Sequence, residues 1–165
     1  MTQYTVKKRL VSVGRDYDVL DESGKVVFRI DGKVRFARTF DVTDPEGNVL
    51  FAVKEKLLTL DRTHVVSAPG GAETVVRMTS TANAQPMRFE IETPGQAPMT
   101  AQGSFQGDGL TILRGGSTLG SVSRQQETAI HEIFRVYAAS PEEAALVLAL
   151  AMSLVESDSG RGAAP

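Results

Sequence analysis

Side chains with reactive chemistry are sparse in this 165-residue sequence, and their spacing matches no common catalytic pattern. Cysteine is absent, which excludes thiolate nucleophiles, thiolate metal sites and disulfides. The glycine-rich stretch Gly115–Ser121 (GGSTLGS) has a serine where a phosphate-binding loop needs a lysine. Asp16 and Asp18 begin like a calcium-binding EF-hand loop, but Val27 takes the place of its bidentate glutamate.

Two histidines and a pair of glutamates are the remaining candidates for metal binding or acid–base chemistry. His64 and His131 would need further carboxylate ligands to hold a metal, and Glu132 faces away from His131 if both lie in one strand. Glu90 and Glu92 share a strand face, which could place two carboxylates together. The simpler interpretation is that this face is exposed to solvent and has no catalytic role. We therefore expect no catalytic residue, no metal site and no cofactor, and a protein that is not an enzyme.

The basic residues give a stronger indication of function. Residues 1–62 carry twelve basic and ten acidic groups, whereas the remainder carries six basic and ten acidic groups. A basic surface patch attracts anionic lipid headgroups by about 1 kcal/mol per Lys or Arg. The alternative is that these charged side chains only keep the protein surface soluble and prevent strand ends from pairing with other strands. The candidate patch consists of Lys7, Lys8, Arg9, Arg29, Lys33, Arg35, Arg38, Lys54 and Lys56.

An internal repeat indicates which elements must position these residues. Residues 17–34 (YDVLDESGKVVFRIDGKV) and residues 40–57 (FDVTDPEGNVLFAVKEKL) share seven identities in eighteen positions at an offset of 23. Each of five turn-prone tetrads ends in a glycine, which predicts five hairpins. These glycines are Gly24, Gly47, Gly70, Gly95 and Gly116.

Alternating apolar residues flank the turns, which predicts half-buried antiparallel strands. With one strand before the hairpins, near residues 4–9, and one after them, near residues 132–138, the total is about twelve. A sheet of this size tends to curl, and closure removes its edges, so we expect a barrel, with a two-sheet sandwich as the main alternative. The predicted inward side chains are Tyr17, Val19, Val26, Phe28, Ile30, Phe40, Val42, Val49, Phe51, Val53, Phe89 and Ile91.

The C-terminal segment changes from strand to helix patterning. Ser140, Pro141 and Glu143 are typical of a helix start with a capping box. The apolar run that follows covers every side of a helix, which predicts burial, and it is too short to span a membrane. The sequence therefore predicts a mainly β (β+α) fold, a closed antiparallel barrel of about twelve strands around a buried helix at about 141–156. A helix lying on one sheet face is the alternative.

Two segments, Asp21–Val34 and Asp44–Leu57, resemble the LURP-one-related family, which is grouped with Tubby C-terminal domains and phospholipid scramblases. The ending EIFRVYAASPEEAALVLALAMSLVE is similar to this family as well. The resemblance covers about residues 2–156 and implies a twelve-stranded barrel around a C-terminal helix. The chain departs from the pattern in the fourth and fifth units, where Gly120 stands at the position that matches Phe51. The related groups imply binding of phosphoinositide headgroups or association with membranes.

Taken together, the residues predict a single domain, residues 1–156, and a disordered tail, residues 157–165. We expect a binding or scaffold domain whose basic patch contacts anionic phospholipid or a protein partner. A small-molecule carrier, which needs an empty lumen, and an enzyme with an exterior cleft are the alternatives. The formal charge of −2 argues against a nucleic-acid partner. With no transmembrane span or secretory signal in the pattern, we expect a cytoplasmic protein, peripheral at the membrane if lipid is its ligand.

Overall fold

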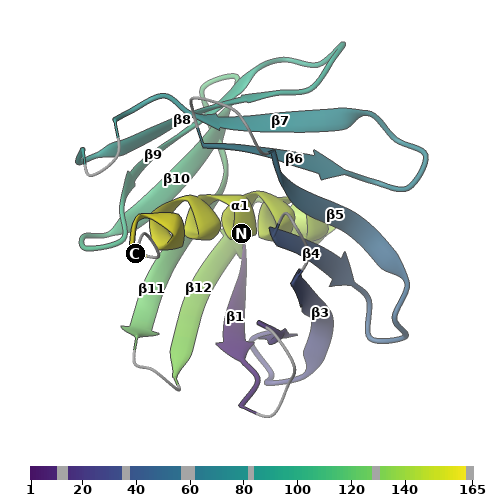
Figure 1. Cartoon of the computed structure of the whole chain (residues 1–165). Coiled ribbons are helices and arrows are strands. Elements are labelled where there is room, and N and C mark those ends of the chain that lie inside the picture. Colours follow the sequence, from purple (N-terminus) through teal and green to yellow (C-terminus); the bar gives the residue numbers. More distant parts are fainter. Residues whose placement is uncertain (11–14, 35–37, 57–61, 82–83, 128–130, 163–165) are drawn as a thin grey trace.

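The computed structural model of this chain describes most residues and their side chains (Figure 1). The described residues are 1–10, 15–34, 38–56, 62–81, 84–127 and 131–162, with the side chains of 34, 38, 126, 127 and 159–162 excepted. The strands in this part are β1 (Thr2–Lys8), β2 (Tyr17–Leu20), β3 (Val26–Val34), β4 (Arg38–Thr43), β5 (Val49–Lys56), β6 (Thr63–Ser67), β7 (Glu73–Met78), β8 (Met87–Glu92), β9 (Met99–Ser104), β10 (Gly109–Arg114), β11 (Ser117–Glu127) and β12 (Glu132–Ala138). The helical elements are η1 (Pro141–Glu143), a 3-10 turn, and α1 (Ala144–Gly162).

The strands form a closed barrel in which each strand pairs with its neighbours in the sequence. β1 closes the ring by pairing antiparallel with β12, where Tyr4 lies opposite Val136. Closure gives each described strand a partner on both sides, which removes the sheet edges. The predicted closed antiparallel barrel is confirmed, and a two-sheet sandwich is excluded.

The two hairpins that carry the repeated sequence have the same loop chemistry. In each loop the aspartate carboxylate accepts a hydrogen bond from the backbone N–H four residues later, Asp21 from Lys25 (3.0 Å) and Asp44 from Asn48 (2.9 Å). The glycine three residues after each aspartate has a φ of 86° or 94°, which L side chains rarely adopt. Aspartate and glycine together therefore determine both turns, and the turns fix how the flanking strands pair.

A β-bulge after each of these loops shifts the alternation of side chains by one residue. The register breaks before Leu20 in the β2–β3 pair and before Thr43 in the β4–β5 pair. Val49 is therefore 40% exposed, so its predicted inward position is wrong, and Val26 at the equivalent place is only half-buried. Of the other predicted inward residues, Phe28 and Phe51 are partly buried against the core, and those fully buried are Tyr17, Val19, Ile30, Phe40, Val42, Val53, Phe89 and Ile91.

Helix α1 runs through the lumen, with β6 to β10 on one side of it and β11, β12, β1 and β3 on the other (Figure 1). Every side chain from Val147 to Asp158 is at most 8% exposed. A helix that is apolar on all sides is stable here because the barrel wall surrounds it. The predicted buried helix is confirmed, and a helix lying on the outside of the sheet is excluded.

Gly120 lets the helix approach the barrel wall. A Cβ atom at this position would lie 2.5 Å from the backbone oxygen of Tyr137 and 2.6 Å from Cγ1 of Val147 in α1. Both distances are too short for any side chain. The fifth hairpin therefore departs from the repeat, because the helix occupies the space that a phenylalanine would need.

The start of the helix differs from the predicted capping box. Ser140 makes no side-chain capping hydrogen bond, and the first turn is the 3-10 turn η1. The carboxylate of Glu143 instead forms an ion pair with Arg114 at 2.6 Å. A partner on a neighbouring hairpin thus replaces the local contact that the motif predicts.

The end of the helix also lies beyond the predicted boundary. The sequence predicts a disordered tail from residue 157, but α1 continues to Gly162, and Ser157 and Asp158 are buried. The residues after Glu156 are small and polar, which favours fraying in isolation. The helix continues past Glu156 because Arg124 of β11 pairs with Asp158 and Arg62 donates a hydrogen bond to the backbone oxygen of Ser157.

Candidate functional site

The antiparallel topology gathers the connections of the barrel at two opposite ends. We call the first the hairpin end, and its tight turns lie at residues 21–25, 44–48, 68–72, 93–98 and 114–117. We call the second the basic end; it contains the last residues of β1, β3 and β5 and the first residues of β4 and β6. The helix starts at the hairpin end and finishes at the basic end.

Seven of the nine predicted patch residues belong to the basic end. They are Lys7, Lys8, Arg9, Lys33, Arg38, Lys54 and Lys56. Arg29 lies in the middle of β3. Arg35 falls outside the described residues, as does the side chain of Arg38. Antiparallel pairing thus gathers cations that are spread over 50 residues of sequence.

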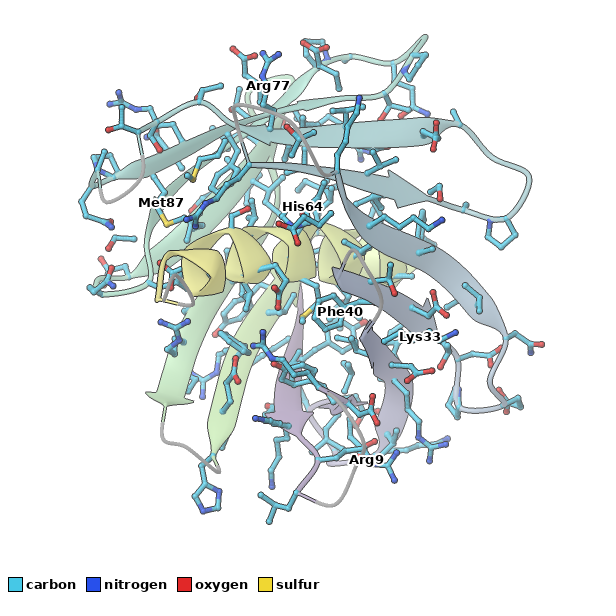
Figure 2. All side chains as sticks on the ribbon, in the orientation of Figure 1. Arg9, Lys33, Phe40, His64, Arg77 and Met87 are labelled. Atoms are coloured by element: carbon cyan, nitrogen blue, oxygen red, sulfur yellow. The ribbon has the colours of Figure 1, made fainter. Side chains whose placement is uncertain are left out.

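Strand alternation directs most of these cations outward. Lys33, Lys54 and Lys56 are exposed on the outer face of the wall, whereas Ile30 and Val53 on the same strands face the lumen. Lys7 and Arg29 are exposed as well, and Lys8 is half-buried at the barrel mouth. In Figure 2, Arg9 and Lys33 extend away from the helix.

The strand register divides the cations into two groups. Lys33 lies opposite Thr39, and Thr39 lies opposite Lys54, so one row carries two lysines on alternate strands. In a second row, Lys7 lies opposite Asp18, which lies opposite Arg29. Among the described residues, the register therefore defines two clusters, Lys33 with Lys54 and Lys7 with Arg29.

Acidic side chains partly neutralise both clusters. Arg29 pairs with Asp18 at 3.6 Å, and Lys33 pairs with Asp41 at 3.0 Å. The four side chains are partly exposed, so each pair contributes little to stability. Among the described residues, Lys7, Lys8, Arg9 and Lys54 form no ion pair.

A groove of about 310 Å³ beside Arg9 and Arg29 has mixed charge. Asp16 and Asp31 line the same groove. Burial, together with a hydrogen bond to Asp16, raises the pKa of the Asp31 carboxyl group above its usual value. These carboxyl groups make this groove a poor site for an anion.

The opposite end of the barrel is acidic. The basic side chains among its described residues are Lys25 and Arg114, and Arg29 of β3 reaches this end by donating a hydrogen bond to the backbone oxygen of Pro45 at 3.4 Å. Its acidic side chains are Asp21, Glu22, Asp44, Glu46, Glu73, Glu92, Glu142 and Glu143. The protein therefore separates charge along the helix axis, and this separation exists only after the strands have paired.

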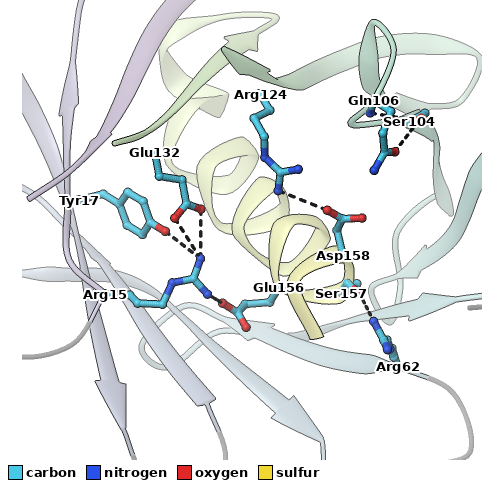
Figure 3. Close-up of polar contacts among 10 residues, drawn as sticks. All are labelled: Arg15, Tyr17, Arg62, Ser104, Gln106, Arg124, Glu132, Glu156, Ser157 and Asp158. Atoms are coloured by element: carbon cyan, nitrogen blue, oxygen red, sulfur yellow. Dashed lines mark hydrogen bonds and ion pairs between the residues drawn. The ribbon is translucent and has the colours of Figure 1, made fainter. Parts of the chain in front are cut away.

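Three arginines converge on the end of the helix at the barrel mouth (Figure 3). Arg15 contacts Glu156 of α1, Glu132 of β12 at 3.1 Å and the hydroxyl of Tyr17 at 3.1 Å. Because Tyr17 is buried, the pKa of its hydroxyl is raised well above the ordinary value, so it remains neutral. Arg15 therefore joins the helix to two strands of the wall.

The other two arginines bind α1 at Ser157 and Asp158, before the helix ends at Gly162. Arg124 forms an ion pair with Asp158 at 3.2 Å. The Cζ atom of Arg124 also lies over the aromatic rings of Phe105 and Phe134, 5.1 Å and 5.6 Å from the ring centroids. Arg62 donates a hydrogen bond to the backbone oxygen of Ser157. Arg15, Arg62 and Arg124, which we call the arginine cluster, thus attach α1 to the barrel wall through Glu156, Ser157 and Asp158.

No residue pattern in the sequence singles out this arginine cluster. Arg15, Arg62 and Arg124 come from separate segments with no shared motif. The one feature of the sequence that points to such a cluster is the position of Glu156 and Asp158, which directly follow the apolar run of a buried helix. Acidic groups at that position need buried cations as partners.

The side chains considered for catalysis do not assemble in the described structure. His64 is buried inside the barrel, whereas His131 is exposed at the basic end. Glu90 forms a surface ion pair with Arg77, and Glu132 binds Arg15. Within the described residues, no group of three or more His, Asp or Glu side chains is arranged to hold a metal ion.

The fold and the site define a class: a twelve-stranded antiparallel barrel closed around its own C-terminal helix, with a basic and an acidic end. Residues 2–155 match the model of the LURP-one-related family. The chain belongs to this family. A comparison with curated proteins gave no match. In the described part of the chain, no helix is long and apolar enough to cross a membrane.

Proposed function

We propose that this chain is a non-enzymatic binding domain whose basic end contacts anionic phospholipid at the cytoplasmic face of a membrane. The observation that carries the proposal is the separation of charge between the two ends of the barrel. Outward cations that form no ion pair with any described residue lie at the basic end, and acidic side chains outnumber basic ones at the hairpin end. An anionic surface would attract one end and repel the other, which orients the protein.

Other features of the fold agree with a binding role. Helix α1 occupies the lumen that a small-molecule carrier would need, which speaks against that alternative. The carboxylate of Glu132 at the barrel mouth is paired with an arginine, and a general base would instead need access to a substrate. Phospholipid is favoured over a protein partner because cations alone suffice to bind a charged membrane surface.

Vesicle binding tests the proposal. The protein should co-sediment with vesicles of phosphatidylcholine and phosphatidylserine but not with phosphatidylcholine alone. Binding should weaken when salt rises from 0.1 M to 1 M, because the Debye length falls from about 10 Å to about 3 Å. No binding to anionic vesicles, with a stoichiometric protein captured from native lysate instead, would replace the lipid with a protein partner.

A matched pair of variants locates the contact. Lys54→Gln at the basic end should lower the vesicle partition coefficient about fivefold, equivalent to about 1 kcal/mol. Lys25→Gln at the hairpin end removes the same charge and should leave the coefficient unchanged. Equal losses from both variants would show that net charge alone causes the binding.

A further inference from the structure

An exposed leucine lies among the cations of the basic end. Leu10 follows Lys7, Lys8 and Arg9 directly and is 66% exposed. A single exposed apolar side chain is ordinary on a protein surface and needs no explanation. Leu10 is informative because it borders a groove whose lining is both apolar and basic.

This groove lies at the basic end, where β1 pairs with β2 and β12, and its volume is about 300 Å³. We call it the β1 groove. Lys7 lies opposite Ile133 on one side and opposite Asp18 on the other. Its lining residues are Lys7, Lys8, Leu10, Asp18, Leu20, His131, Glu132 and Ile133.

The charges of the β1 groove favour an anion. Both carboxylates in the lining already have arginine partners, since Asp18 pairs with Arg29 at 3.6 Å and Glu132 pairs with Arg15 at 3.1 Å. Lys7 and Lys8 form no ion pair with any described residue. An anion that enters the groove therefore meets two lysines whose charge no described acidic group neutralises.

The apolar part of the lining indicates what kind of anion would bind. Leu10, Leu20 and Ile133 surround the lysines, and none of the three belongs to the buried core. Free phosphate has no apolar atoms to contact these side chains. A phospholipid in a bilayer presents a phosphate directly above an apolar boundary, which matches both parts of the groove.

We propose that the β1 groove binds the phosphate group of a membrane phospholipid while Leu10 inserts into the bilayer interface. This inference rests on the proposed membrane binding and assigns it to one groove and one anchor. Lys7 and Lys8 bind the phosphate oxygens, and the bilayer removes the Leu10 side chain from water. Burial of that side chain adds to the electrostatic attraction and persists when salt screens it.

A single tryptophan reports insertion directly, because the chain contains no tryptophan of its own. The fluorescence of a Leu10→Trp variant should shift to the blue when vesicles of phosphatidylcholine and phosphatidylserine are added. The control is Val49→Trp, which places the probe at a 40% exposed position beside a turn of the hairpin end. Its emission should not change. Inorganic phosphate alone should leave both spectra unchanged.

A second pair of variants measures the contribution of the anchor. Leu10→Ser should lower vesicle affinity about tenfold, consistent with loss of a buried leucine side chain, while the melting temperature stays that of the parent. Val75→Ser, at another exposed apolar position on β7, should leave affinity unchanged. Lys7→Gln should weaken binding and make it less dependent on salt.

The outcomes separate this inference from the proposed function. If the parent protein binds vesicles but Leu10→Trp does not shift and Leu10→Ser binds normally, the groove assignment is overturned and membrane binding stands. If inorganic phosphate displaces the protein and Leu10→Ser has no effect, the groove binds soluble phosphate and the lipid assignment is wrong. If no variant or parent binds anionic vesicles, both proposals fail.

Discussion

His64 lies beside the helix inside the barrel with its imidazole buried, and its Nδ1 atom has no hydrogen-bond partner among the described residues (Figure 2). Burial lowers its pKa to about 4, and the charge of Arg62 adds to this effect. In the unfolded chain the pKa returns to about 6.5. The unfolded state therefore takes up a proton first, and stability is lost as pH falls from about 6.5 to about 4.

The size of this loss is measurable. Between about pH 7.5 and about pH 4.5, His64 should account for about 2–3 kcal/mol of the decrease in the free energy of unfolding. Urea denaturation at both pH values should show that His64→Gln loses less stability than the parent. His131→Gln, at an exposed position, is the control and should behave like the parent. Equal pH dependence in all three proteins would contradict this assignment.

Leu148 tests burial of the helix by a single charge. Its side chain is 1% exposed in the middle of α1. Leu148→Asp should prevent folding, because a buried charge without a partner costs several kcal/mol and typical stabilities are 5–15 kcal/mol. Leu10→Asp places the same charge at an exposed site and should fold. Circular dichroism and thermal melting distinguish the two, and a cooperatively melting Leu148→Asp variant would show that this position is not buried.

At the scale of elements, the arginine cluster should contribute much more than surface ion pairs. The side chains of Arg124 and Asp158 are 12% and 7% exposed, whereas those of Arg77 and Glu90 are 47% and 49% exposed. Arg124→Met leaves the buried carboxylate without this cation and should lower the free energy of unfolding by about 3 kcal/mol. Arg77→Met should cost less than about 1 kcal/mol. Urea unfolding of both variants tests the difference.

A double variant identifies the cause of the loss. Arg124→Met combined with Asp158→Leu removes the charge that would be left without its partner. It should be more stable than Arg124→Met alone, because an apolar pair of similar volume can replace a buried ion pair. If the double variant loses as much as the two single changes added together, the ion pair does not couple these positions.

Most of the elements could be predicted from the sequence because their signals are local. The turn residues around Gly24 and Gly47 and the period-two alternation of the strands act within a few neighbouring residues. The inward position predicted for Val49 is wrong because of a β-bulge. A bulge depends on how two strands pair, and the alternation of side chains along one strand carries no information about that pairing. The helix end beyond Glu156 is not predictable for the same reason, since its partners Arg62 and Arg124 are distant in the sequence.

The candidate site could likewise be predicted only in part. The basic residues are visible in the sequence as a charge difference between its first 62 residues and the remainder. Which of them lie together is determined by the register, which separates Lys7 from Lys33 and places Lys54 near Lys33. The β1 groove was not predictable, because its lining combines two ends of the sequence that meet only where β1 pairs with β12.

At the scale of the whole molecule, closure of the barrel does two things at once. It surrounds the helix, which removes an apolar surface from water and fills the lumen. It also gathers cations at the end where the helix finishes and acidic groups at the end where it starts. The result is a closed barrel whose charge differs between its two ends, which is the basis of the proposed function.

Hydrogen exchange with and without anionic vesicles tests this claim most directly, because it reports both ends of the barrel in one experiment. Vesicles of phosphatidylcholine and phosphatidylserine should slow exchange of the backbone amides near residues 7–10 and 53–56. They should not change exchange in the turns at residues 21–25 and 44–48. Protection of those turns, or no protection at residues 7–10 and 53–56, would contradict binding through the basic end.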